Sequence, residues 1–174
     1  EPFLDVDYSD AREIPQDPIR YMLGDLNLSD DQLKTLRGLY QGELHYLDSC
    51  LRDIYSFLDT EGALDNTVVV FVGDHGDNIG DHGLMSHFYS LHDSLVRVPC
   101  AVQLPSAKTS TVGSQIQVTD LFPLILREAG VLRDEDTADK FAEVPPPFGD
   151  GRELAVSELL GVNPPEQAVD RRTD

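Results

Sequence analysis

Seven side chains that can bind a metal ion or exchange protons lie in one short stretch, between residues 74 and 92. They comprise four of the chain's five histidines and three aspartates: Asp74, His75, Asp77, Asp81, His82, His87 and His92. Together such groups suit a divalent ion, Ca²⁺ or Mg²⁺ where carboxylates dominate and Zn²⁺ or Mn²⁺ where histidines do. A bound ion of this kind can hold an anionic sulfate or phosphate ester.

The pair Asp74-His75 follows an unbroken apolar run, Val68–Val72, and Gly73. A run of this composition predicts a strand over 66–72 that is buried on both faces and therefore parallel to its neighbours. Open α/β sheets bind ligands beyond the carboxyl ends of such strands, which favours Asp74 and His75 as metal ligands. The structural alternative is that Asp-His-Gly is only a turn, with Asp77 serving the turn or solvent.

A long helix is expected before this strand. Ser29-Asp30-Asp31-Gln32 has the form of a capping box, in which Ser29 and Gln32 satisfy each other's backbone amides. Apolar residues then recur at every third or fourth position from Leu33 to Leu58, and Gly62 is a natural stop. On this helix, Gly38 and Gly42 permit close packing against another element, and His45 is a packed or solvated side chain.

The other elements are expected in the following order: a helix over 90–96, strands over 98–104 and 115–118, a helix over 120–129 that Thr119 caps and Gly130 ends, a surface loop over 131–152 and a strand over 153–157. This order predicts the α/β class, with too few strands for a complete doubly wound sheet. Three segments result: an irregular connection over 1–28, an α/β part over 29–160 and a frayed tail over 161–174.

The composition is strongly acidic. Asp and Glu number 32 against 13 Lys and Arg, so the formal net charge is −19. Such a surface is tolerated where salt screens it, which favours a high-salt cytosol, although an acidic protein that binds divalent cations is the alternative. Nucleic acid and anionic membranes are excluded as partners, and no apolar run is long enough to span a membrane. Two cysteines, Cys50 and Cys100, are expected to be buried free thiols.

Several motifs together resemble the type I sulfatases of the alkaline phosphatase superfamily, over residues 29–132. They are Asn66-Thr-Val-Val-Val-Phe-Val-Gly-Asp-His-Gly76, Gly80-Asp-His-Gly-Leu84, Ser90-Leu-His-Asp-Ser-Leu-Val-Arg-Val-Pro99, Tyr40-Gln-Gly-Glu-Leu-His-Tyr-Leu-Asp48 and Val118-Thr-Asp-Leu-Phe-Pro-Leu-Ile-Leu126 with Ala129-Gly130. The resemblance implies an alkaline-phosphatase-like, parallel-sheet α/β sandwich, present here as its C-terminal portion and similar to haloarchaeal members.

The resemblance also implies roles for single residues. Asp74 and His75 match the pair that completes the divalent metal site, which holds Ca²⁺ in sulfatases. His87 falls where many sulfatases carry a lysine that binds the sulfate, so it would contact the ester or protonate the leaving group. His82 would orient the ligands, Arg97 would pair structurally or contact substrate, and His92, at a position that is usually tyrosine, is treated as structural.

The chain departs from the family pattern at the nucleophile. Neither cysteine lies in the Cys/Ser-x-Pro-x-Arg motif that matures to formylglycine, and the family's N-terminal Asp-Asp metal pair is absent. We therefore expect the formylglycine on an N-terminal half of the same fold, and little or no catalysis by this segment alone. The expected substrate is a small-molecule sulfate ester. The alternatives are a metal-dependent phosphodiesterase or phosphonate hydrolase of the same superfamily, and a non-catalytic scaffold.

Overall fold

The computed structural model describes residues 2–105, 111–131 and 155–158. The chain divides into two compact units. Among the described residues, unit 1 comprises 2–57, 75–97 and 158, and unit 2 comprises 58–74, 98–105, 111–131 and 155–157. Asp74 is the last residue of its segment in unit 2, and His75 opens the next segment of unit 1. The two proposed metal ligands are therefore consecutive in sequence but belong to different units.

Two short helices, α1 (Tyr8–Ala11) and α2 (Pro18–Leu23), lie in the segment that we expected to be irregular. The second is capped at both ends. The Asp17 carboxylate accepts a hydrogen bond from the Arg20 amide at 3.0 Å, and Gly24 ends the helix in the left-handed region at φ 78°. Helices of four and six residues are too short to show an apolar period in the sequence.

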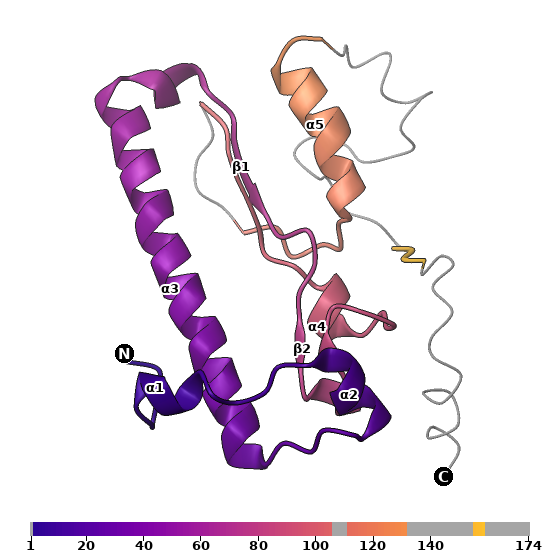
Figure 1. Cartoon of the computed structure of the whole chain (residues 1–174). Helices are drawn as coiled ribbons and strands as arrows, with labels where there is room; N and C mark the ends of the chain where they lie inside the picture. The colour runs from indigo at the N-terminus through magenta and orange to yellow at the C-terminus, as the bar shows by residue number, and fades with distance from the viewer. Residues whose placement is uncertain (1, 106–110, 132–154, 159–174) are drawn as a thin grey trace. The chain divides into compact units, whose positions relative to one another are not determined.

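The long helix α3 (Asp30–Thr60) is present as expected (Figure 1). Its capping box is confirmed, since the Ser29 hydroxyl accepts from the Gln32 amide at 3.2 Å and the Gln32 side chain accepts from the Ser29 amide at 2.9 Å. Gly38 is buried, and a Cβ there would collide with the Phe3 carbonyl oxygen. The expected close packing at this glycine is thus made by the N-terminal segment.

The apolar stripe of α3 is covered over only part of its length. Leu36 is buried, but Leu44, Leu47 and Ile54 stay exposed, the last by 56%. The periodicity of the sequence indicates which side chains of the helix are apolar, but it cannot indicate which segment packs against them.

In unit 2, strands β1 (Val69–Val72) and β4 (Cys100–Gln103) form an antiparallel pair, in register from Val69 opposite Gln103 to Val72 opposite Cys100. The expected parallel arrangement is not found in the described residues, and Phe71 is 41% exposed, so β1 is not buried on both faces. An apolar run indicates a strand but carries no information about its direction or its neighbours.

The core of unit 2 forms where α5 (Leu121–Glu128) lies along the β1–β4 pair (Figure 1). Leu121 and Leu124 are buried there, and the partly buried residues packed against them are Val70, Val72, Val102 and Ile116. This core anchors the strand that leads to Asp74. The helix ends as expected at Gly130, which adopts φ 70°.

A short 3₁₀ helix, η3 (Val118–Asp120), precedes α5, and 3₁₀ helix η1 (Ala63–Asn66) precedes β1. The prediction of a strand over 115–118 was wrong, because residues 115–117 form no regular element and Val118 begins η3. The Asp120 side chain accepts from the Gln117 amide at 2.8 Å, and this reciprocal cap turns the chain into a helix and replaces the cap expected from Thr119.

In unit 1, the polar loop contains a short antiparallel ladder of β2 (Asn78–Ile79) and β3 (Met85–Ser86), with Asn78 opposite Ser86 and Ile79 opposite Met85. The 3₁₀ helix η2 (Asp81–Gly83) connects them, and α4 (Asp93–Val96) follows. The helix expected over 90–96 is therefore present in shortened form. Leu84 and Met85 of the loop and Leu95 of α4 are buried.

The expected loop over 131–152, apart from Val131, and the tail over 161–174 lie outside the described residues. Residues 155–157, the described part of the last expected strand, form no regular element. In the described segments no helix combines the length and apolar character needed to cross a bilayer.

Both cysteines are free thiols, but Cys50 is only partly buried and Cys100 is exposed, so the expected burial was wrong.

Candidate functional site

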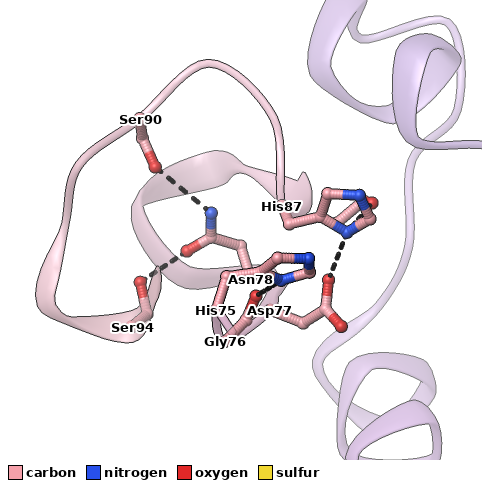
Figure 2. Close-up of polar contacts among 8 residues, drawn as sticks. His75, Gly76, Asp77, Asn78, His87, Ser90 and Ser94 are labelled. Atoms are coloured by element: carbon pink, nitrogen blue, oxygen red, sulfur yellow. Dashed lines mark hydrogen bonds and ion pairs between the residues drawn. The ribbon is translucent and has the colours of Figure 1, made fainter. Parts of the chain in front are cut away.

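His75 is exposed and its ring orientation is defined by the backbone. Its Nδ1 lies 2.9 Å from the Gly76 carbonyl oxygen (Figure 2). Because a carbonyl oxygen only accepts, this hydrogen bond requires the proton on Nδ1 and leaves Nε2 as the basic nitrogen. In metal-binding histidines one ring nitrogen commonly donates to a carbonyl while the other binds the ion. Asp74, also exposed, follows β1 directly after Gly73.

His87 lies against His75. The two ring centroids are 4.3 Å apart, with 30° between the ring planes. The Nδ1 atom of His87 is 3.2 Å from Asp77 Oδ1 (Figure 2). The same atom lies 3.3 Å from the Ser86 hydroxyl. The structure therefore brings together two of the predicted site residues and adds Asp77, which the sequence interpretation had assigned to the turn or solvent.

Gly76 is required by a close backbone approach. A Cβ at this position would collide with the Ser94 carbonyl oxygen, and the Gly76 amide donates to the Leu95 carbonyl at 2.9 Å. The motif Asp-His-Gly is thus a tight turn, and this turn is also what places His75. The structural and the functional interpretation of the tripeptide are compatible.

A fully buried side chain, Asn78, ties the loop together. Its Nδ2 donates to the Ser90 hydroxyl at 3.4 Å, and its Oδ1 accepts from the Ser94 hydroxyl at 2.6 Å (Figure 2). These bonds join the first half of the loop to the segment that leads into α4. The sequence offered no sign of this role, because Asn is also a common turn residue.

Removal of this anchor is a test of the loop's stability. Asn78→Ala is expected to lower the free energy of unfolding by about 1–3 kcal/mol, because it leaves two partly buried hydroxyl groups without their partner. Ser94→Ala should cost more than Ser90→Ala, in line with the shorter hydrogen bond of Ser94. Urea denaturation measures all three, and equal stability of Asn78→Ala and wild type would contradict the assigned role.

The remaining histidines of the loop form a second pair. His82 and His92 stack with ring centroids 3.8 Å apart and 20° between planes. His92 also precedes α4, where its carbonyl accepts from the Leu95 amide at 2.8 Å. This agrees with a structural role for His92, while the orienting role of His82 stays a prediction. Arg97 is exposed at the C-terminal end of α4.

Three residues of this loop other than glycine adopt left-handed backbone conformations: His82 at φ 54°, Ser86 at φ 67° and Tyr89 at φ 61°. Such conformations are costly for residues with a Cβ and concentrate at functional sites. The strained positions flank His87 on both sides.

Within residues 2–105, 111–131 and 155–158, no group of three or more His, Cys, Asp or Glu side chains is placed to hold a metal ion. Two donors do not complete the coordination shell of Ca²⁺, Mg²⁺ or Zn²⁺. The described residues therefore do not complete the site of a resident ion by themselves.

A cavity of about 950 Å³ lies in unit 1, beside the loop. Its wall includes Asp77 and Ser86, the two residues that contact His87 Nδ1, together with Arg12, Tyr8 and Tyr40. Its volume is at the upper end of the range for small-molecule sites. The wall also includes Glu43, so two carboxylates line the cavity together with the one arginine.

Comparison with known proteins finds similarity to sulfatases and to a protein of the alkaline phosphatase superfamily. The family model described as Sulfatase matches residues 6–131. The multifunctional alkaline phosphatase superfamily protein PehA of Trinickia caryophylli is 30% identical over 76 residues, which is 44% of this chain and 15% of that protein. Arylsulfatase K of Danio rerio is 28% identical over 108 residues, 60% of this chain and 20% of the relative.

The extracellular sulfatase SULF-1 homolog of Drosophila melanogaster is 30% identical over 118 residues, 67% of this chain and 10% of the relative. In each of these three alignments the chain spans a fifth or less of the relative's length.

Proposed function

Because this chain belongs to the sulfatase family, we propose that it is part of a metal-dependent sulfatase that hydrolyses a small-molecule sulfate ester. It would form the C-terminal part of the sulfatase domain and complete the site together with an N-terminal half of the same fold. The chain spans only 15–20% of the first relatives' lengths. The net charge of −19 supports operation in a high-salt cytosol.

The stack of His75 on His87 is the observation that carries this proposal. It places the His75 ring, whose Nδ1 bonds to the Gly76 carbonyl, beside a second ring suited to the anionic ester. Asp74 and His75 would be two of the metal ligands, with Ca²⁺ as the expected ion, and the remaining ligands and the formylglycine would come from the N-terminal half. His87 would donate from Nε2 to an ester oxygen or to the leaving group, and His82 and Arg97 would support the ligands or the substrate.

Metal binding tests the assignment of Asp74. In the enzyme that contains both halves, Ca²⁺ is expected to raise the Tm, because an ion that binds only the folded state stabilises it by mass action. Asp74→Ala should remove this rise. Asp93→Ala, which removes an exposed carboxylate in the first turn of α4, is the matched control and should keep it. A Ca²⁺-dependent rise in Tm that survives Asp74→Ala would contradict the assignment.

A second candidate follows from the similarity to a multifunctional protein of the alkaline phosphatase superfamily. The enzyme would then be a metal-dependent phosphodiesterase or phosphonate hydrolase. Assays with matched aryl sulfate and aryl phosphodiester substrates separate the two. A higher kcat/KM for the phosphodiester, or the absence of a Cys/Ser-x-Pro-x-Arg motif in the N-terminal half, would favour the second candidate. No activity on either ester and no metal-dependent stabilisation would favour a non-catalytic scaffold.

A further inference from the structure

The contact between Asp77 and His87 restrains the orientation of the histidine ring. We propose that Asp77 is a positioning residue: it holds the Nδ1–H of His87, fixes the ring and directs Nε2 toward the sulfate group. The part that concerns sulfate rests on the proposed function of His87. The restraint on the ring is independent of that function, because it follows from contacts within unit 1 alone.

The ladder register explains why these two residues meet. Asn78 pairs with Ser86, and Ile79 pairs with Met85. In an antiparallel ladder, the next pair outward joins residue 77 to residue 87, and side chains at such directly opposed positions are close neighbours. Asp77 and His87 thus lie opposite each other just beyond the end of β2 and β3, although ten residues separate them in sequence.

The chemistry of the neighbours determines which nitrogen of His87 carries the proton. A carboxylate is an acceptor only, so the 3.2 Å contact between Asp77 Oδ1 and Nδ1 is a hydrogen bond only when Nδ1 is protonated. The Ser86 hydroxyl, at 3.3 Å from the same nitrogen, can accept as well. An unprotonated Nδ1 could accept a hydrogen bond from the Ser86 hydroxyl, but the lone pair of Nδ1 would then also face the Asp77 carboxylate. The arrangement that satisfies all three groups is Nδ1–H.

The ring is also confined by its other contacts. His75 stacks on it at 4.3 Å, and the Phe88 ring lies 4.6 Å away at 45°. The His87 side chain is nevertheless 40% exposed and that of Asp77 34%. The histidine is therefore held in orientation while it stays accessible to a ligand. When both ring nitrogens carry protons, Nδ1 donates to Asp77 and Nε2 can donate to an anionic ester, whereas the neutral Nδ1–H form offers Nε2 as an acceptor.

The tautomer of His87 provides a direct test in this chain. Long-range ¹H–¹⁵N spectra of histidine-labelled protein, recorded at about pH 8.5 where an ordinary histidine is neutral, distinguish Nδ1–H from Nε2–H. We expect Nδ1–H in the wild type and in Asp93→Ala, and a shift toward Nε2–H in Asp77→Ala. Asp77→Asn, which keeps an acceptor oxygen, should retain part of the Nδ1–H form. A wild-type ring in the Nε2–H form, or one that Asp77→Ala leaves unchanged, would overturn the proposal.

Kinetics of the enzyme with both halves test the role in sulfate hydrolysis. Asp77→Ala is expected to lower kcat for an aryl sulfate by about 10- to 100-fold, as is typical when the hydrogen-bond partner of a functional histidine is lost, with a smaller change in KM. Asp77→Asn should recover part of the loss. If the enzyme has no sulfatase activity, the proposed function fails while the tautomer result stands. If it is active and Asp77→Ala leaves kcat unchanged, the positioning role fails.

Discussion

An enzyme that carries His87→Ala is expected to hydrolyse an aryl sulfate with a kcat/KM about 100- to 10,000-fold below the wild-type value. This range is typical for loss of a side chain that transfers a proton or donates to the reacting group. The methyl group of alanine provides neither function, and it also removes the ring that stacks on His75. Steady-state kinetics of the enzyme with both halves measure the effect.

His92→Ala is the matched comparison for this variant. It breaks the other stacked histidine pair, and its expected effect is on the stability of the loop, with a far smaller effect on kcat/KM. Circular dichroism confirms that both variants are folded before their rates are compared. If His87→Ala and His92→Ala lost activity equally, His87 would have a structural role, and the assignment of the ester-binding side chain would be wrong.

Leu124→Ala is expected to lower the free energy of unfolding of unit 2 by about 2–5 kcal/mol. The side chain is 3% exposed, and its cluster with Leu121 packs against Val70, Val72 and Val102. Truncation leaves a cavity between α5 and the strand pair, which cannot collapse freely because both strands are held in register by the ladder. Since β1 leads into Asp74, weaker Ca²⁺ binding should accompany the loss of stability.

Ile125→Ala on the same helix is the control. This side chain is 43% exposed, so its truncation should cost well under half as much as that of Leu124. Urea denaturation followed by circular dichroism compares the two variants. Similar losses would show that the cluster around Leu124 is not the core of unit 2.

Local features of the fold were predictable because their causes lie close together in sequence. The capping box of Ser29 and Gln32, the helix that follows it and the stop at Gly130 each depend on residues within one or two helical turns. The apolar run before Asp74 predicted a strand for the same reason. The motif resemblance predicted the sulfatase family, which the match over residues 6–131 confirmed.

Features that depend on pairing with distant residues were not predictable. The direction of β1 is determined by how the chain returns through Gly73 and Pro99 to β4, and this return made the pair antiparallel. The strand expected over 115–118 failed because Gln117 and Asp120 form a reciprocal cap. An apolar pattern carries neither strand direction nor the identity of a packing partner.

The candidate site shows the same difference between local features, which were predictable, and contacts with distant residues, which were not. The sequence by itself determined that carboxylates and imidazoles gather after β1, because residue types and spacing are sufficient to show a concentration of ligands. Only the tertiary structure decided that His75 stacks on His87, that Asp77 bonds to His87 Nδ1, and that Asn78 anchors the loop. These contacts depend on ladder register and on one glycine beside Ser94, since a shift of a single residue in register would turn each side chain to the opposite face.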